Sequence, residues 1–336
     1  MPVGQLDVLN RTTLTATVQN FKYPQLQLSA YYGAMRPERT KMGDTAEWDI
    51  LKPTRSMAKP KAPGAPAKLV ALEPMGHRIA RCIHVAEKLP LDGDRLANLR
   101  QPGTDSDPLN DQLYVAQQQL TLDRRRAMLR EFAIAQMFTG ALAVNEDDIK
   151  VAVDYAVDST HKPTAAASWA TASTDIHADL KTWKLLAEQD SGYTITDIWA
   201  RSAVNGYLLN NTQVGKYLRS SEATNQVTRE GFVSRLFGFN WHWYDAGYMV
   251  NGTFTPFIAE NQLIMTPEPD PSWMGVIEGS TKINPNPGDQ KLVDAWGPYA
   301  YIRLKDDPAA YVLYQGDTFL PVLKIPDAIV YAKVVA

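Results

Sequence analysis

Three side chains that can bind a metal ion lie close together in the sequence: His77, Cys82 and His84. If this segment forms a strand, Cys82 and His84 point to the same face and can supply two ligands. A structural zinc site needs four ligands, and no third or fourth candidate lies nearby in the sequence. We therefore expect no metal site, and we interpret the segment as a half-buried strand.

The sequence lacks the motifs of the common catalytic sites. It contains no Gly-x-Ser-x-Gly elbow, no phosphate loop with Gly-Lys-Ser/Thr and no His-Glu-x-x-His zinc helix. No pair of acids stands out as a glycosidase dyad. The run Trp241-His242-Trp243-Tyr244 has the composition of a sugar-stacking platform, but aromatic alternation on a strand is more often core. We expect no enzyme, no catalytic residue and no cofactor.

The run Arg124-Arg125-Arg126 is a second chemical feature, with two interpretations. The three cations can bind phosphate groups, or they can pair with carboxylates of a neighbouring chain. Successive residues of a helix point about 100° apart, so the run cannot form one flat basic patch. We favour salt bridges across subunits over nucleic-acid contact.

Residues 50–81 differ in composition from the rest of the chain. They contain seven Lys and Arg residues and a single acid, Glu73, together with five prolines. Such a segment can bury little apolar area, so we expect it to project as a loop and to return as a strand through Ile79, Ile83 and Val85. The alternative is a solvated flexible insertion. The cations before Glu73 are Lys52, Arg55, Lys59, Lys61 and Lys68.

A long helix is the clearest element that the sequence predicts. Asp107-Pro108 is a helix start, and neither proline nor glycine follows until Gly140. Leu113, Leu120, Ala127 and Ile134 recur every seven residues, so we expect one helix of roughly 30 residues, about 45 Å long, that acts as a strut.

The other elements are shorter. We expect helices over parts of residues 6–14, 175–188, 195–209 and 212–218. We expect extended segments at 26–30, 149–157, 239–243 and 328–335, and a hairpin turn at Asn251-Gly252.

Composition excludes several classes of protein. The chain has 336 residues, 45% hydrophobic and 21% charged, which is ordinary for a folded protein. Its single cysteine, Cys82, excludes an intrachain disulfide framework. No apolar stretch approaches the roughly 18–20 residues of a membrane helix, and Met1–Asp7 shows no secretory signal. The net charge of −3 argues against a dedicated nucleic-acid binder, so we expect a soluble cytoplasmic chain.

Taken in order, these features resemble the lambda-type major capsid protein E family of tailed phages. The resemblance covers nearly the whole chain. The long helix is its most specific part, and the order and spacing of the segments carry the identification. The matching segments are Asn20–Pro24 with Leu26 and Leu28, Asp107-Pro108, Arg124–Arg126, Glu131–Gln136, Tyr248–Gly252, Pro256–Ile258 with Asn261, Asp307-Pro308 and Pro326–Ala328.

The resemblance implies an α+β fold, the shell fold of tailed-phage capsids. Its parts would be an N-terminal arm at 1–32, an extended loop with flanking strands at 33–95, a peripheral domain at 96–174 with a spine helix at 108–139, an axial domain at 175–298, a return to the peripheral domain at 299–317 and a C-terminal strand returning to the axial domain at 318–336. The extended loop, through Lys52, Arg55, Lys59, Lys61 and Lys68, and the spine, through Arg124, Arg125 and Arg126, would contact adjacent subunits.

The implied function is that of a major capsid protein that assembles into hexamers and pentamers of an icosahedral shell around packaged double-stranded DNA. Expected partners are further copies of the chain, portal, scaffolding and possibly decoration proteins, and packaged DNA in non-specific contact, but no membrane. The expected location is the virion capsid, and the host cytoplasm during assembly. Three alternatives stay open: an encapsulin-type compartment shell, a carbohydrate-binding or hydrolytic protein built on the Trp-rich strands, and a tail or baseplate component.

Overall fold

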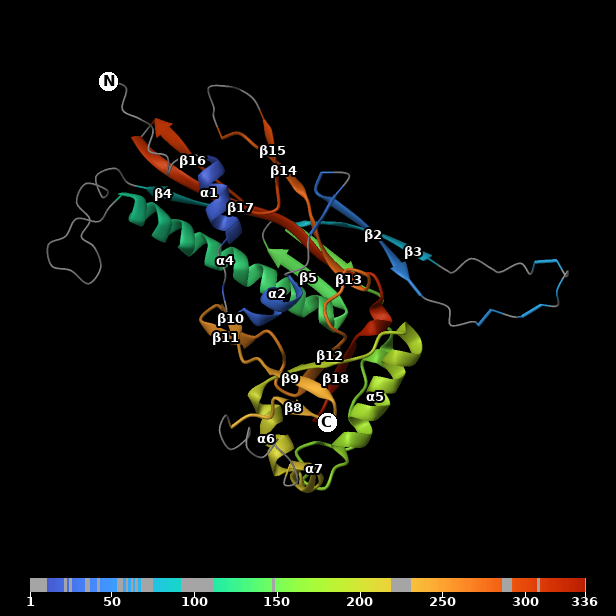
Figure 1. Cartoon of the computed structure of the whole chain (residues 1–336). Helices are drawn as coiled ribbons and strands as arrows, with labels where there is room; N and C mark the ends of the chain where they lie inside the picture. Colours follow the sequence, from blue (N-terminus) through green and yellow to red (C-terminus); the bar gives the residue numbers. More distant parts are fainter. Residues whose placement is uncertain are drawn as a thin grey trace.

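The computed structural model describes residues 11–20, 23, 26–33, 37–40, 43–52, 57–58, 60–61, 63, 66–67, 75–91, 111–146, 149–218, 231–285, 292–306 and 309–335. Helices and strands are both present, in two packed regions and one projecting hairpin (Figure 1). Within the part of the chain that the structure describes, no helix is long and apolar enough to span a membrane.

A five-stranded sheet forms the upper part of the molecule in Figure 1. Its centre is β17, a strand of 15 residues that pairs with β16 and β4 along its first part and with β13 along its last. A short parallel strand, β1, completes the sheet beside β13. The bounds are β1 Glu38–Arg39, β4 Ile83–Leu91, β13 Met274–Glu278, β16 Tyr299–Asp306 and β17 Ala309–Leu323.

Helix α4, Asp111–Thr139, packs along this sheet (Figure 1). Gly140 follows it with a positive φ of 87°, a conformation that glycine adopts without steric cost and that commonly ends helices. The chain then forms the hairpin β5, Ala141–Glu146, and β6, Ile149–Asp154. The predicted strut is confirmed over Asp111–Thr139, whereas its predicted start at Asp107-Pro108 lies outside the described residues.

The second packed region contains a mixed sheet in the order β18-β12-β7-β9-β8, covered by three helices. Asp175 caps the first of these helices, since its Oδ1 accepts the Ala178 N–H at 3.0 Å. The bounds are α5 Ile176–Ser191, β7 Asp197–Ala200, α6 Ser202–Asn210, α7 Thr212–Leu218, β8 Arg235–Leu236, β9 Phe239–Trp243, β12 Gln262–Thr266 and β18 Val330–Lys333.

Three two-stranded pairs lie outside these sheets, in addition to β5–β6. Strands β2 and β3 form a hairpin that extends from the body at the right of Figure 1. Strands β10 and β11 are joined at Asn251 and Gly252, whose φ values of 49° and 81° fit a tight hairpin turn. The bounds are β2 Thr45–Leu51, β3 Met75–Arg81, β10 Gly247–Val250, β11 Thr253–Pro256, β14 Ser280–Ile283 and β15 Val293–Trp296.

Buried side chains form two large clusters that follow these regions. The first joins α4 to the hairpins and to the end of β17, and the second lies between α5, α6, α7 and the mixed sheet. Strand β13 packs in the first cluster, although the predicted axial range of 175–298 includes it. The clusters meet near β7, where Trp199 belongs to the first cluster and its neighbours Ile198 and Ala200 to the second.

One predicted element is wrong. Residues 26–30 are not extended, because Gln27–Tyr32 forms the helix α2. The helix predicted within 195–209 is confirmed as α6, Ser202–Asn210, and the strand β7, Asp197–Ala200, precedes it, which the sequence did not predict. The helix predicted within 6–14 corresponds to α1, Arg11–Asn20, although residues 6–10 lie outside the described residues. The predicted return strand is divided at Cys82 into β3 and β4, which belong to different sheets. The remaining expected elements are confirmed with small shifts of their bounds. Of the predicted strand 149–157, only Ile149–Asp154 pairs with β5. Tyr155 and Val157 lie beyond the end of the strand, although both are buried.

Candidate intersubunit surfaces

Arg126 lies inside the molecule, between helix α4 and strand β17. Its side chain is 9% exposed; its Nε donates to Asp123 Oδ1 at 2.6 Å, and its Nη1 donates to Asp317 Oδ2 at 3.0 Å. Asp123 also accepts hydrogen bonds from the Gln315 amide and the Tyr23 hydroxyl. A buried guanidinium held by two carboxylates in this way fixes the helix against the sheet.

Arg130, one turn further along α4, completes this buried network. Its Nε and Nη2 donate to the two oxygens of Asp317 at 2.6 and 3.1 Å, and Nη2 lies 3.6 Å from Glu278 Oε1. Burial by itself would raise the pKa of Asp317, but Arg130 and Arg126 outweigh it and hold the pKa below its ordinary value. Burial raises the pKa of Glu278, and Arg130 offsets only part of that effect.

The other two arginines of the run face outward. Arg125 pairs with Glu87 on β4, with Nη2 2.7 Å from Oε1, and this pair is largely exposed. Arg124 is exposed and has no ion-pair partner among the described residues. The carboxylate partners that the structure shows for Arg125 and Arg126 belong to this chain. Whether any of the three also contacts a second copy stays a prediction.

The β2–β3 hairpin exposes one amphipathic face. Along β2, burial alternates so that Ala46, Trp48 and Ile50 point inward, while Glu47, Asp49 and Leu51 point outward. Their cross-strand partners on β3 are Ile79, His77 and Met75. Met75 and Ile79 are 62% and 60% exposed, which is unusual for large apolar side chains on a strand.

The predicted contact residues of the extended loop are only partly described. Lys52 and Lys61 are exposed, while Arg55, Lys59 and Lys68 lie outside the described residues. The described part of residues 57–67 lies far from the body of the molecule, at the right of Figure 1. This position agrees with the predicted projection, but it does not test contact with another subunit.

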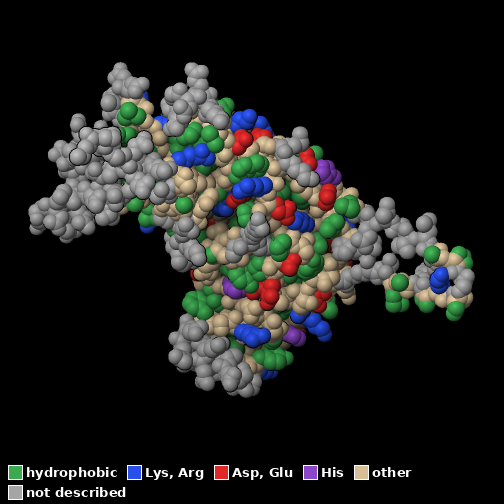
Figure 2. Space-filling model, turned by 45° about the horizontal axis from the view of Figure 1, so that its top comes forward, with side chains coloured by type: hydrophobic (Ala, Val, Ile, Leu, Met, Phe, Trp, Pro, Cys, Tyr) green, Lys and Arg blue, Asp and Glu red, His purple; other side chains and the backbone are tan. Residues whose placement is uncertain are grey.

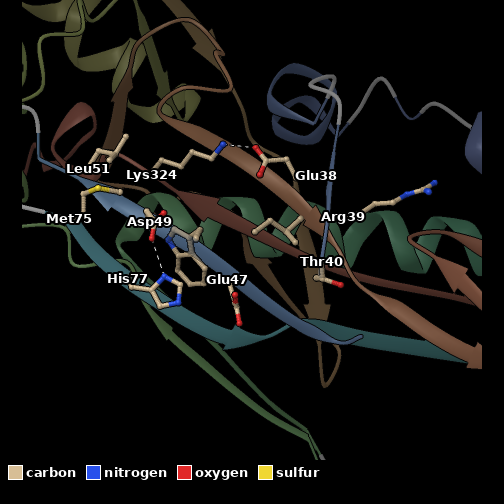
Figure 3. A pocket seen from close by; sticks show the side chains of 11 residues that line it. Glu38, Arg39, Thr40, Glu47, Asp49, Leu51, Met75, His77 and Lys324 are labelled. Atoms are coloured by element: carbon tan, nitrogen blue, oxygen red, sulfur yellow. Dashed lines mark hydrogen bonds and ion pairs between the residues drawn. The ribbon is translucent and has the colours of Figure 1, made fainter. Parts of the chain in front are cut away.

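A groove of about 460 Å³ runs between the root of this hairpin and strands β1 and β13 (Figure 3). In Figure 3, Glu47, Asp49 and His77 come from the hairpin, and Glu38 and Lys324 face them from the other wall. His77 Nδ1 lies 3.0 Å from Asp49 Oδ1, and Lys324 Nζ donates to Glu38. The lining residues are Glu38, Arg39, Thr40, Glu47, Trp48, Asp49, Leu51, Met75, His77, Ile277 and Lys324.

Sequence reasoning missed Glu131, a fully buried acid of α4. Its Oε1 accepts the Leu28 N–H at 2.9 Å and its Oε2 accepts the Ser29 N–H at 2.7 Å, both at the start of α2. The Tyr244 hydroxyl donates to the same carboxylate, and burial followed by the Glu131 charge raises the pKa of Tyr244. The Glu131 side chain therefore connects α4, to which it belongs, with α2 and with the segment after β9.

The metal-capable side chains do not converge. Among the described residues, no group of three His, Cys, Asp or Glu side chains is placed to bind a metal ion. His77 faces Asp49 in the exposed groove, and His84 Nδ1 lies 3.0 Å from Thr318 Oγ1. Cys82 is buried, and burial, with smaller effects of Asp44 and Asp317, raises the pKa of its thiol to about 12. This thiol is unreactive at neutral pH.

The Trp-rich strand is part of the core and offers no stacking platform. Trp241 is buried, and its ring stacks on that of Trp243 at 5.4 Å with an interplanar angle of 16°. The Trp243 indole N–H donates to the Val233 carbonyl at 2.8 Å. His242 stacks on Trp199 at 4.2 Å, and its Nε2 lies 2.8 Å from Asp197 Oδ1. The rings of Trp241, His242 and Trp243 therefore all contact other groups of the same chain.

Known structures share this fold. A capsid protein of a prophage of E. coli CFT073 is 14% identical, with a TM-score of 0.63 over 97% of this chain and 99% of that one. A phage-related protein from Bordetella bronchiseptica RB50 is 12% identical, with a TM-score of 0.60 over 97% and 98% of the two chains. The capsid structure of the cyanophage P-SCSP1u gives 11% identity and a TM-score of 0.53 over 88% and 85%. The fold is therefore that of phage capsid proteins.

The sequence also matches a family. The family described as phage major capsid protein E matches residues 10–334, nearly the whole chain, whereas no curated protein matches it. The chain belongs to the phage major capsid protein E family. It is a structural subunit of the virion shell and not an enzyme, which confirms the resemblance, the fold class and the function predicted from the sequence.

Proposed function

We propose that copies of this chain form hexamers and pentamers that close into a shell around packaged double-stranded DNA, and that the extended hairpin grips the adjacent copy. The observation that carries this proposal is the β2–β3 hairpin, which leaves the body of the molecule with exposed Met75 and Ile79 on one face. Exposed apolar side chains without a partner in the subunit are stabilised by contact with a neighbour.

The shell would be stable because many modest contacts act together. Each copy would present one surface to the next around a symmetry axis, and such head-to-tail interfaces close into rings when the rotation permits. Once two copies share one contact, the next contact forms at high effective concentration. Weak pairwise affinity is therefore sufficient for a closed shell.

The two buried clusters support an assignment of parts. The region of α4 and β17 would be the peripheral domain, and the region of α5, α6, α7 and the mixed sheet would be the axial domain around the capsomer centre. Strands β13 to β15 would go with the peripheral part, because β13 pairs with β17. The N-terminal arm, residues 1–32, would reach both parts through α2.

Further partners follow from the shell role. Portal, scaffolding and decoration proteins would bind the shell, and assembly would take place in the host cytoplasm. Contact with packaged DNA would be non-specific and weak. On the face shown in Figure 2, Lys and Arg side chains are interspersed with Asp and Glu. Together with a net charge of −3, this pattern favours a container that releases its DNA over one that binds it tightly.

Deleting Lys59–Ala67 tests the role of the loop. We expect a folded, soluble chain that forms no shells, because the strands of the hairpin remain but the segment that reaches the neighbour is gone. Negative-stain electron microscopy and sedimentation measure the outcome, with circular dichroism as the control for folding. Particles of normal size from the deletion variant would refute the role of the loop.

Of the alternatives, the encapsulin-type compartment shares the shell architecture but is less well supported, because the matching family is that of phage major capsid proteins. Packaging of DNA, rather than of a cargo enzyme, distinguishes the two in purified particles.

A further inference from the structure

The groove at the hairpin root carries an unbalanced negative charge on the wall formed by β2. Glu47 and Asp49 both point outward from this strand, and only His77 faces them from β3. Glu47 has no ion-pair partner among the described residues. The hairpin wall is therefore acidic, and it offers carboxylates to a cationic ligand.

The cations of the groove are already engaged elsewhere. Lys324 Nζ donates to Glu38 and also to the Pro271 carbonyl at 3.0 Å. The Arg39 guanidinium lies over the Trp296 ring, 5.6 Å from its centroid. Neither cation forms an ion pair with Glu47 or Asp49 among the described residues, and Figure 3 shows Lys324 paired with Glu38 on the wall opposite β2.

The groove also has an apolar end. Leu51 and Met75, which line the groove, form the cross-strand pair where β2 and β3 pass into the loop, and they are 37% and 62% exposed. A ligand for this surface combines apolar groups with positive charge. A purely polar cation would leave the apolar pair in water.

One segment of the chain has this chemistry. Residues 52–68, which we name the strap, carry five cations and no acid, with four prolines between them. They also carry Met57, which is 87% exposed. Proline-rich segments adopt an extended conformation with little entropy left to lose on binding, at about 3.1 Å per residue.

We propose that the groove of one copy receives the strap of a second copy, with strap lysines paired to Glu47 and Asp49 and strap apolar groups on Leu51 and Met75. The proposal rests on the proposed function, in which the extended loop reaches an adjacent subunit. It adds the receiving site, and each copy then offers one strap and one groove, as a head-to-tail ring requires.

A second copy fits the groove better than the chain's own strap. The groove lies at the root of the hairpin, whereas the described part of residues 57–67 lies at the far end of the projection, away from the body (Figure 1). The described part of the strap therefore lies away from the groove of its own subunit, where a second copy can meet it.

Charge reversal on both sides tests the pairing. Glu47→Lys with Asp49→Lys in the groove, and Lys59→Glu with Lys61→Glu in the strap, are each expected to abolish shells in electron microscopy, because like charges then face one another. Combining all four changes is expected to restore shells. Glu260→Lys, a reversal at an exposed acid outside the groove, is the matched control and is expected to leave assembly unchanged. Normal assembly of the groove variant, or no rescue by the combination, overturns the proposal.

Cysteine cross-linking decides between the two sources of the strap. In Glu47→Cys with Lys61→Cys, oxidation of assembled shells is expected to give covalently linked chains on a denaturing gel, and Glu260→Cys with Lys61→Cys is expected to give none. The native Cys82 can stay, because it is buried. Monomers closed by an internal disulfide would show that the strap folds onto its own groove, and that result, like the absence of any disulfide, overturns the proposal.

The two proposals fail in different ways. If deletion of Lys59–Ala67 abolishes shells but Glu47→Cys forms no intermolecular disulfide, the loop still grips a neighbour and only the groove is the wrong receiving site. If the deletion variant forms normal shells, the role of the loop itself is wrong.

Discussion

Three consecutive arginines have three different roles in this subunit, because successive residues of a helix turn by about 100°. Arg126 points into the molecule and holds Asp123 and Asp317, Arg125 reaches sideways to Glu87 on β4, and Arg124 points outward. A buried carboxylate without its cation is costly, whereas an exposed arginine contributes little to the stability of the subunit. The same residue type therefore serves the fold at one position and is available to a neighbour at another.

Arg126→Ala is expected to lower the free energy of unfolding of the unassembled chain by about 3–5 kcal/mol, because it leaves Asp123 and Asp317 buried with less compensation. Arg124→Ala, the matched control, is expected to change it by less than about 0.5 kcal/mol. Urea unfolding followed by circular dichroism measures both values. Equal effects of the two substitutions would show that the buried network does not hold the helix.

The subunit is expected to lose stability in acid through Asp317. Its folded pKa lies below the ordinary value of about 3.9, so the unfolded chain binds the proton more readily and stability falls as the pH drops from about 5 through the folded pKa. Glu278, whose pKa is raised, contributes the opposite slope and weakens this trend.

Urea midpoints between pH 3 and pH 6 measure the effect. Asp317→Asn is expected to be less stable at pH 6 and to show a flatter dependence on pH than the natural sequence. An unchanged slope in Asp317→Asn would assign the acid sensitivity to other carboxylates.

At the scale of the element, α2 is the part of the arm that connects the others. It has only six residues, too few to be stable alone in water, and it has no capping side chain at Leu26. Its first N–H groups are instead satisfied by Glu131 from the middle of the spine, and the Tyr32 ring packs at 4.9 Å from that of Phe138 on α4. Its helical form thus depends on contacts with α4.

Glu131→Gln is expected to loosen α2. The carboxylate accepts the Leu28 N–H and the Ser29 N–H on different oxygens, whereas the amide has one acceptor oxygen, so one of these N–H groups faces an NH2 donor instead. A lost buried partner costs about 1–3 kcal/mol. Hydrogen exchange measured by mass spectrometry is expected to show faster exchange over residues 27–32. Glu260→Gln, at an exposed acid outside the groove, is the control, and equal protection in both variants would contradict this account.

At the scale of the whole molecule, two buried clusters give a subunit with its own core, while the hairpin remains outside both along most of β3. This division suits a shell protein, because the body folds independently of the contacts that assemble it. The charges also differ between the body and the loop. Both signs are mixed over the face in Figure 2, whereas cations are concentrated in residues 52–68.

The unassembled chain is expected to bind double-stranded DNA weakly and without a steep dependence on salt. A protein that makes 6–10 phosphate contacts loses about 10³- to 10⁵-fold in affinity between 50 and 200 mM salt. Fluorescence anisotropy with a labelled duplex at these two salt concentrations measures the slope. Strong binding that collapses at the higher concentration would show that the chain carries a true DNA-binding surface.

Elements with a strong local pattern were predictable from the sequence. Helix α4 was predictable because neither proline nor glycine interrupts its heptad repeat. The hairpin turn at Asn251-Gly252, where both residues adopt positive φ, was predictable as well. Strand β7 was not predicted, since a short apolar run fits either a strand or a helix, and only its place between β12 and β9 decides. The groove was not foreseen, because β1, β13 and the hairpin meet only in the fold.

The sequence by itself determined the period of each strong element, the projecting basic segment and the family, because these depend on neighbouring residues and on their order. Only the tertiary structure decided which arginine is buried, what makes α2 a helix and where the acidic groove lies. The physical reason is distance along the chain: Asp317 lies 191 residues from Arg126 and Glu131 lies 103 residues from Leu28, so no local pattern contains these contacts.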